Sequence, residues 1–311
     1  MKMSVLVVGS IALDTVETPF GKVEDALGGS AVYFSASAAN FHPVQVVGVI
    51  GDDFPDGALD LLSERGVDLK GVAERKGESF RWSGVYSFDL NTRETLDTRL
   101  GVFADFEARI PEEYRNPRIL FLGNIDPEVQ LNVLDQVEST DLVACDTMNL
   151  WIDGNRDALL KVLERTDALL VNDEEVRQLA EEPNLLKAAQ WVQDRGPDTV
   201  VVKKGEHGVM LVDRESVFFL PGYPLEEVFD PTGAGDSFAG GFLGYLASRD
   251  EWTPEEIRTG LVFGSAMGSF AVEDFSVHRL AGVKMDEIMD RVREFRQITS
   301  FEVRAPERQG A

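Results

Sequence analysis

The sequence predicts an α/β protein in which a mainly parallel central sheet is covered by helices on both faces. Short apolar runs typical of buried strands alternate with amphipathic stretches at helical spacing through most of the 311 residues. This alternation is typical of strand-helix-strand crossovers, which build parallel sheets. A content of 43% hydrophobic residues is enough to bury a large core. We therefore expect one domain over residues 1–300 and a flexible tail over residues 301–311.

The individual elements follow from the two kinds of pattern. Apolar runs rich in Val, Ile and Leu predict strands at Val5–Val8, Val44–Ile50, Ile119–Leu122, Leu142–Cys145, Ala168–Val171 and Thr199–Val202. Amphipathic stretches predict helices at Ala58–Arg65, Glu128–Val137, Asp157–Glu164, Glu174–Ala180 and Leu185–Arg195, and small residues predict a further helix at Ser30–Asn40. Ligands bind at the carboxyl ends of the strands in such sheets, so polar residues that follow the strands are the first site candidates.

Two segments break the strand-helix rhythm. Asp14–Leu27 is short, polar and rich in turn residues, and Phe80–Leu100 alternates like a hairpin about the turn Asp89–Thr92. Together they can form a small sheet that projects from the core. A pair of separate surface hairpins is the alternative.

The composition excludes several classes of function. The formal net charge is −25, from 55 acidic and 30 basic residues, so nucleic acid or an anionic membrane surface would be repelled. No apolar stretch is long enough to span a bilayer, and we expect the chain in the cytoplasm. Cys145 is the only cysteine, which rules out an intramolecular disulfide and indicates a buried thiol. The acid excess is also compatible with a high-salt habitat.

The run from Asp230 to Gly241, Asp-Pro-Thr-Gly-Ala-Gly-Asp-Ser-Phe-Ala-Gly-Gly, is the strongest indication of function. Its glycines allow a tight turn and the close approach of a ligand to the backbone. The apolar spacing that follows predicts a buried helix that opens near Asp236. The free amides of Gly233, Ala234 and Gly235 would then form an anion site, because a helix N-terminus carries unpaired N–H groups and partial positive charge.

A carboxylate beside an anion site repels phosphate unless it has a chemical role. Asp236 can accept the proton of a substrate hydroxyl that attacks the terminal phosphate of a nucleotide, while the amides stabilise the transferred group. The structural alternative is that Asp236 caps a helix and the glycines form a turn. The whole run resembles the C-terminal signature of the ribokinase-like (PfkB) carbohydrate kinases, Asp-Thr-x-Gly-Ala-Gly-Asp, with Pro231 in place of the usual Thr.

This resemblance implies a fold and an activity. The fold is a ribokinase-like three-layer αβα sandwich with a mainly parallel central sheet and a small β lid, to which segments 14–27 and 80–100 correspond. The activity is transfer of the γ-phosphate of ATP, with Mg²⁺, to a hydroxyl group. Asp236 would be the general base and the amides of Gly233, Ala234 and Gly235 the anion hole.

Further elements match the family in order. Gly9-Ser10 followed by Asp14, and the pair Gly28-Gly29, fall on positions that hold the acceptor. A carboxylate at Asp14 can accept hydrogen bonds from two neighbouring hydroxyls, and a double glycine lets the substrate lie against backbone. Read in isolation, Asp14 would be a solvated turn residue and the glycine pair the turn before a helix.

The residues expected to bind the nucleotide come directly after two later strands in the sequence. Asn172 and Glu175 lie on one side of a first helical turn, where the amide would contact phosphate and the carboxylate would hold Mg²⁺ through water. Helix capping is the alternative for this pair. Lys203 and Gly205 fall on nucleotide-contacting positions of the family, and lysine suits phosphate as a point charge.

Three positions bear on variation within the family. Asp230 and Thr232 match positions that flank a monovalent-cation site in some relatives, so activation by K⁺ is a secondary prediction. Tyr33 stands where ribokinase and adenosine kinase commonly have an Asn that binds the acceptor hydroxyls. Its single hydroxyl cannot replace an amide that both donates and accepts, which makes ribose itself a less secure acceptor. The segment Asp146–Trp151 only partly matches a family motif and receives little functional weight.

The expected function is an ATP-dependent kinase that phosphorylates a small sugar or polyol. A nucleoside or inositol kinase is the alternative, since aromatic residues can stack on a base: Trp82, Tyr86 and Phe88 of the lid, with Tyr33. A phosphorylated acceptor would need the lid arginines Arg81, Arg93 and Arg99, for which ion pairs with Glu94 and Asp97 are the alternative. A non-catalytic ligand-binding regulator of the same fold is the second alternative. The lid sheet also permits a homodimer through its edge.

Overall fold

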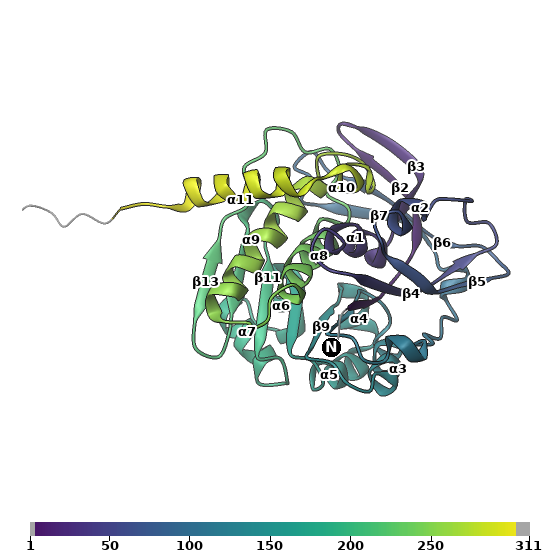
Figure 1. Cartoon of the computed structure of the whole chain (residues 1–311), viewed down its shortest axis with the longest axis horizontal. Coiled ribbons are helices and arrows are strands. Elements are labelled where there is room, and N and C mark those ends of the chain that lie inside the picture. The colour runs from purple at the N-terminus through teal and green to yellow at the C-terminus, as the bar shows by residue number, and fades with distance from the viewer. Residues whose placement is uncertain (1–3, 303–311) are drawn as a thin grey trace, which may run out of the picture.

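The computed structural model describes residues 4–302, and its main feature is a nine-stranded sheet (Figure 1). In sheet order the strands are β13 Val217–Leu220, β12 Val209–Val212, β11 Thr199–Lys203, β10 Ala168–Asn172, β9 Leu142–Asp146, β8 Ile119–Leu122, β1 Val5–Val8, β4 Val44–Gly51 and β5 Asp68–Arg75. Neighbours from β11 to β5 are parallel, and β12 and β13 add an antiparallel edge. The predicted parallel α/β fold is confirmed.

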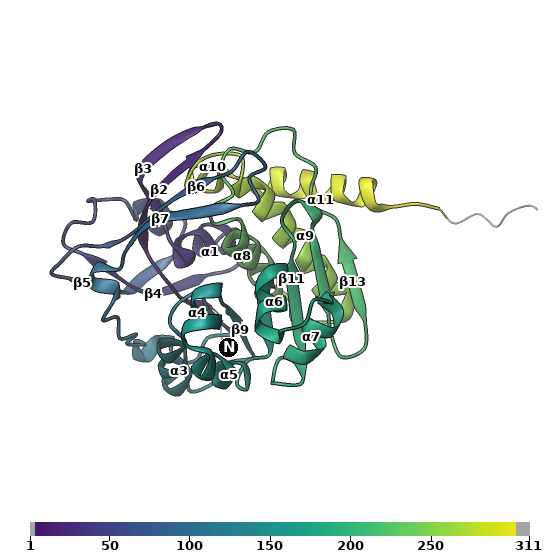
Figure 2. The same ribbon diagram turned by 180° about the vertical axis from the view of Figure 1, so that it is seen from behind.

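Helices cover both faces of this sheet, as the two opposite views show (Figures 1 and 2). One face packs against α1 Ser30–Ala38, α2 Asp60–Ser63, α8 Ala234–Ala247, α9 Pro254–Ala271, α10 His278–Gly282 and α11 Met285–Thr299. The other packs against α3 Pro127–Gln136, α4 Asn149–Gly154, α5 Arg156–Leu163, α6 Asp173–Ala180 and α7 Leu185–Gln193. Successive strand residues point to opposite faces, so Val5 and Val7 lie in the first core and Leu6 and Val8 in the second.

The strand boundaries differ from the expected ones in an instructive way. Three strands are one residue longer at their carboxyl ends than the sequence predicted. The added residue is polar in each strand: Asp146 in β9, Asn172 in β10 and Lys203 in β11. These residues therefore stand at the carboxyl edge of the sheet, where ligands bind in parallel folds. The sequence patterns missed β5, whose residues are mostly half-buried, and the antiparallel edge strands. Cys145 is buried, as expected.

The two segments that break the strand-helix rhythm form one four-stranded sheet, which confirms the predicted lid. Its order is β3 Gly21–Gly28, β2 Ala12–Thr18, β6 Phe80–Tyr86 and β7 Arg93–Arg99. Both views place this lid at the β4 and β5 side of the molecule. The lid reaches the carboxyl edge of the main sheet because β2 follows β1 closely and β6 follows β5.

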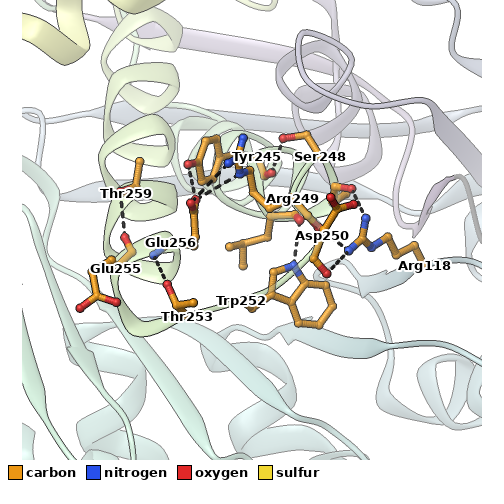
Figure 3. Close-up of polar contacts among 12 residues, drawn as sticks. Arg118, Tyr245, Ser248, Arg249, Asp250, Trp252, Thr253, Glu255, Glu256 and Thr259 are labelled. Carbon is orange, nitrogen blue, oxygen red and sulfur yellow. Dashed lines mark hydrogen bonds and ion pairs between the residues drawn. The ribbon is translucent and has the colours of Figure 1, made fainter.

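The far end of α8 is anchored by a single arginine (Figure 3). Arg118, which precedes β8, donates from Nη1 to the carbonyl of Ala247 at 2.9 Å and from Nη2 to the carbonyl of Asp250 at 3.2 Å. Its guanidinium also lies 5.6 Å from the ring of Trp252, whose indole N–H donates to Leu246. The last carbonyl of α8, that of Ala247, is thus satisfied by a cation, which complements the negative end of the helix.

Short 3₁₀ turns complete the fold at Gly101–Phe103, Glu112–Tyr114 and Gly205–His207 (η1, η2 and η3). Within residues 4–302, no helix combines the length and apolarity that crossing a bilayer requires. The remaining residues of the expected C-terminal tail, 303–311, lie outside the described part of the chain.

Candidate active site

The signature run opens α8 two residues earlier than the sequence indicated. The helix starts at Ala234, because Gly233 already takes the N-cap position with φ 73°. A Cβ atom at Gly233 would lie 2.2 Å from the ring of Tyr33, so only glycine fits there. Asp236 is consequently the third residue of the helix rather than its cap. Tyr33 itself is buried beneath this turn.

The first turn of α8 presents the expected anion site. In any helix the first four N–H groups lack partners within the helix, and here they belong to residues 233–236. One of them is engaged, because the Ala234 amide donates to the carbonyl of Pro231 at 3.2 Å. The positive end of the helix dipole adds to this donor set. The turn can therefore stabilise a phosphoryl group.

Asp236 lies in surroundings that suit a general base. Burial, and next the charge of Asp146, raise its pKa from 3.8 to about 7, while Lys203 and Arg93 lower it. A carboxyl with a pKa near neutrality can accept a proton from an alcohol more readily than an ordinary aspartate. The expected base thus has the appropriate electrostatics.

Lys203 and Asp146 form a buried ion pair beside this turn. Lys203 Nζ lies 2.8 Å from Asp146 Oδ2, and the side chains are only 17% and 7% exposed. A Cβ atom added to Gly235 would meet Lys203 Nζ at 3.0 Å, so the ammonium group lies directly against the first turn of α8. The sequence patterns gave Asp146 little weight, because its partner is 57 residues away in the chain.

Asn172 and Glu175 form a capping box at the start of α6. Asn172 Oδ1 accepts from the Glu175 amide at 2.8 Å, and Glu175 Oε2 accepts from the Asn172 amide at 2.9 Å. The structural alternative for this pair is therefore realised. Burial, and then the charge of Asp146, raise the pKa of Glu175 to about 7, so this carboxyl faces the same charge cluster as Asp236. A cation would favour its ionised form.

The expected acceptor end of the site combines Asp14 with the two glycines. A Cβ atom at Gly28 would lie 1.9 Å from Asp14 Oδ2, and one at Gly29 would lie 2.4 Å from the carbonyl of Ser10. The glycines therefore make room for the Asp14 carboxyl and for the turn after β1. Burial, and then the charge of Asp230, raise the pKa of Asp14 to about 7. A buried carboxyl of this kind gains from hydroxyl donors, as an acceptor site requires.

Asp230 and Thr232 lie between the acceptor end and α8. Asp230 is 1% exposed, and its Oδ1 accepts from the Thr232 amide at 2.9 Å. Its other oxygen, Oδ2, is buried without a hydrogen-bond partner among the described residues. Burial raises the pKa of this carboxyl. A buried, half-satisfied carboxylate is the kind of group that a cation stabilises.

One face of the lid points into the site. Strand pairing places Asp14 beside Trp82, and Tyr86 of the same face accepts a hydrogen bond from Thr232 Oγ1 at 3.2 Å. The Trp82 ring lies along this face because Gly84 has no side chain, and a Cβ atom there would meet the ring at 2.3 Å. The indole is therefore an aromatic surface on the lid face that Asp14 shares. Phe88, at 92% exposure, lies away from it.

The lid arginines fall on opposite faces. In the strand register of β6 and β7, Arg93 lies opposite Tyr86 and Arg99 lies opposite Arg81. A register shift between these two positions reverses the face of the sheet on which successive β7 side chains lie. Arg93 accordingly shares the inner face and lies 5.2 Å from the Trp82 ring. Arg99 pairs with Asp97 at 3.1 Å, as the alternative interpretation expected. Arg81 instead pairs with Asp25 and Asp53.

The tip of the lid touches the loop expected to hold the nucleotide. Gly205 begins η3 with φ 53°, and a Cβ atom there would lie 3.4 Å from Asn91 Oδ1. Asn91 Nδ2 also donates to Glu206 Oε1 at 3.2 Å. The structure thus places the lid tip against the loop that follows Lys203 and contains Gly205.

The fold and the site define an ATP-dependent kinase whose acceptor is an alcohol group. More narrowly, the chain belongs to the pfkB family of carbohydrate kinases, whose model matches residues 3–280. The predicted family, fold and enzyme class are confirmed.

Several named proteins are similar to this chain in sequence or in fold. A cytidine kinase from Thermococcus kodakarensis is 32% identical over 266 residues, which cover 83% of this chain and 94% of that protein. The crystal structure of a nucleoside kinase from Methanocaldococcus jannaschii has a TM-score of 0.76 at 20% identity, covering 94% of this chain and 99% of that one. A fructokinase variant from Vibrio cholerae, with fructose, ADP and potassium bound, has a TM-score of 0.76 at 17% identity, covering 94% and 98%.

Proposed function

We propose that this kinase phosphorylates a sugar hydroxyl of a nucleoside. The observation that carries the proposal is Trp82, which is the strand partner of Asp14 and whose indole lies along the inner lid face over Gly84. A nucleoside offers hydroxyls to a carboxylate at one end and a flat base to an aromatic surface at the other. A simple sugar has no flat base that could stack on the aromatic surface. This proposal replaces the sugar or polyol that the sequence first favoured, and the cytidine kinase relative supports it.

The roles of the residues follow from their places in the site. Asp14 accepts hydrogen bonds from the acceptor hydroxyls, and Gly28 and Gly29 let the sugar approach the backbone. The acceptor oxygen attacks the γ-phosphorus as its proton passes to Asp236, and the bond from phosphorus to the bridging oxygen of ADP breaks. The amides of Gly233 and Gly235 stabilise the transferred group, and the Ala234 amide would join them on release from the Pro231 carbonyl. Tyr33 supports Gly233 from below, so its proposed part in acceptor binding is indirect.

The nucleotide half holds ATP and its magnesium ion. Glu175 faces the same charge cluster as Asp146, Asp236 and the paired cation Lys203. Among the described residues no three acidic or His side chains surround a metal position, which fits a Mg²⁺ ion held mainly by phosphates and water. Glu175 would hold the ion through water, and Asn172, Lys203 and Gly205 would contact the phosphates. Mg²⁺ supplies neutralisation of charge on the β- and γ-phosphates when it is bound.

A monovalent cation is a further part of the proposal. The orphaned Asp230 Oδ2 fits a K⁺ ion beside the Asp230–Thr232 loop, which leads into α8. We expect turnover to be several-fold faster in K⁺ than in a bulky organic cation at equal ionic strength. Initial rates in chloride salts of the two cations measure this. Equal rates would contradict the K⁺ site and would leave the kinase function untouched.

An acceptor panel tests the nucleoside proposal. ADP release would be measured with cytidine, inosine and adenosine, and with ribose, fructose and inositol. We expect the highest kcat/KM for a nucleoside. A higher kcat/KM for a free sugar would contradict the proposal. No ADP release with any acceptor would favour the non-catalytic regulator.

Substitution of Trp82 locates the base. Trp82→Ala should raise KM for the nucleoside about 10-fold or more, on the scale of one lost stacking contact. Its effect on KM for ATP should be small. Phe88→Ala is the matched control, because Phe88 is an exposed lid aromatic outside the inner face. Equal effects of the two substitutions would show that Trp82 does not contact the base.

A homodimer through the exposed β7 edge stays a prediction.

A further inference from the structure

Asp146 is held rigidly at the end of β9. Its Oδ1 accepts from the Thr147 amide at 2.8 Å, and its carbonyl accepts from Gln130 Nε2 at 3.1 Å. The same Gln130 amide group also donates to the carbonyl of Gly123 at 2.9 Å, which ties the ends of β8 and β9 together. The carboxyl group that faces Lys203 therefore has a fixed position.

Lys203 occupies a place that is unfavourable for an unpaired cation. Its ammonium group lies against Gly235, at the positive end of α8, and helix N-termini repel cations. Burial lowers the pKa of Lys203, but the charges of Asp146 and Glu175 outweigh this effect and raise the pKa overall. Asp146 is the one of these carboxyls in hydrogen-bond contact with the ammonium group. The lysine is thus charged and in place before any phosphate arrives.

We propose that Asp146 is a positioning residue for phosphoryl transfer, which holds Lys203 against the first turn of α8 so that the two residues act as one unit. The inference rests on the proposed kinase function. It assigns no contact between Asp146 and substrate. The ammonium group would meet the transferred phosphate beside the amides of α8, and its placement would depend on Asp146 Oδ2.

The pair also sets the electrostatics of Asp236. Charged and titratable groups face Asp236 from several elements: Asp14 from β2, Tyr33 from α1, Arg93 from β7, Asp146 from β9 and Lys203 from β11. Asp146 raises the pKa of Asp236 and Lys203 lowers it. Removal of either charge should therefore move the acid limb of the pH-rate profile, and in opposite directions.

A double-mutant cycle tests the unit. Asp146→Asn should lower kcat about 10- to 100-fold, and Lys203→Met should do the same or more. In the Lys203→Met background, Asp146→Asn should lower kcat less than 3-fold, because no ammonium group is left for Asp146 to hold. The double variant also removes both buried charges, so it should fold even if Lys203→Met alone is unstable. Equal costs of Asp146→Asn in the two backgrounds would overturn the proposal.

The pH profile supplies a readout that a purely structural role would not move. The acid limb of kcat at saturating Mg·ATP should shift to lower pH in Asp146→Asn and to higher pH in Lys203→Met, each relative to wild type. Asp198→Asn removes one partner of an exposed ion pair with Arg214 and should leave both profile and kcat unchanged. A stable Asp146→Asn variant with a wild-type profile would overturn the proposal.

Failure of the kinase function can be separated from failure of this inference. If the wild type turns over no acceptor, the same cycle would be run on the Kd of a non-hydrolysable Mg·ATP analogue by calorimetry. Non-additive effects of Asp146→Asn and Lys203→Met would support the unit even without turnover. Additive effects on a bound nucleotide would overturn it.

Discussion

Asp236→Asn should reduce turnover about 10²- to 10⁴-fold and at the same time stabilise the folded protein. The first effect is the loss of the group that accepts the proton of the attacking hydroxyl. Mg·ATP binding should be retained, because the amides of α8 and Lys203 are untouched. Steady-state kinetics with the preferred acceptor, and calorimetric titration with a non-hydrolysable nucleotide, measure the two quantities. Turnover at the wild-type level would contradict the assignment of the base.

The gain in stability follows from the pKa of Asp236. The folded value of about 7 lies above the unfolded value near 3.8, so the folded state binds the extra proton between these two pH values. Stability therefore falls as pH rises from about 4 to about 7 and levels off above that value. We expect Asp236→Asn to raise the free energy of unfolding by about 2–4 kcal/mol at pH 8 and by almost nothing at pH 4. Urea denaturation at both pH values measures this.

Asp213 provides the opposite control. Burial raises its pKa, but hydrogen bonds from Ser216 and from the backbone of Glu215 outweigh this and lower it overall. Asp213→Asn should therefore destabilise the protein at pH 8 and leave turnover near the wild-type level. A gain in stability from both substitutions would show that the effect of Asp236 is unrelated to its site.

Gly28→Ala should abolish most of the affinity for the acceptor and spare the nucleotide. The new Cβ atom would overlap Asp14 Oδ2 at 1.9 Å and force the carboxyl away from the acceptor hydroxyls. A hydrogen bond to a charged group contributes about 1.5–3 kcal/mol, which corresponds to roughly a 10- to 150-fold loss in kcat/KM for the acceptor. Acceptor kinetics at saturating ATP and a calorimetric Kd for the nucleotide measure the two effects.

Two comparisons separate this steric effect from general damage. Gly154→Ala adds the same methyl group where no atom lies within 4 Å, so it should have little effect on kinetics. Asp14→Asn should weaken the acceptor by a similar factor, and combining it with Gly28→Ala should add little more. Additive losses would show that Gly28 acts on something other than Asp14.

Local patterns predicted much of the fold and part of the site. The apolar runs located the central parallel strands, and the spacing of Asn172 and Glu175 correctly indicated two residues on the same side of a first helical turn. Such features depend on neighbours a few residues apart. The start of α8 was placed too late, because the αL conformation of Gly233 depends on the Tyr33 ring, which comes from another helix.

The importance of other residues depends on contacts between distant segments. Asp146 matters through Lys203, and no spacing rule links residues 57 positions apart. The position of Trp82 beside Asp14 depends on the register of β2 and β6, which single-strand alternation does not specify. The separation of Arg93 from Arg99 depends on a bulge in β7. In each case the missing information was the pairing of one segment with another.

The contact between the lid tip and η3 has a consequence for the whole catalytic cycle. Asn91 contacts Glu206 of η3, and Tyr86 contacts Thr232 before α8. With the proposed roles, the lid that would cover the acceptor therefore also contacts the loop that would bind the nucleotide. Binding energies linked in this way are reciprocal: by whatever factor ATP tightens the acceptor, the acceptor tightens ATP. Water is itself a hydroxyl compound and competes for the γ-phosphate. A lid that closes fully only over both substrates would protect ATP from wasteful hydrolysis until the proper recipient is bound.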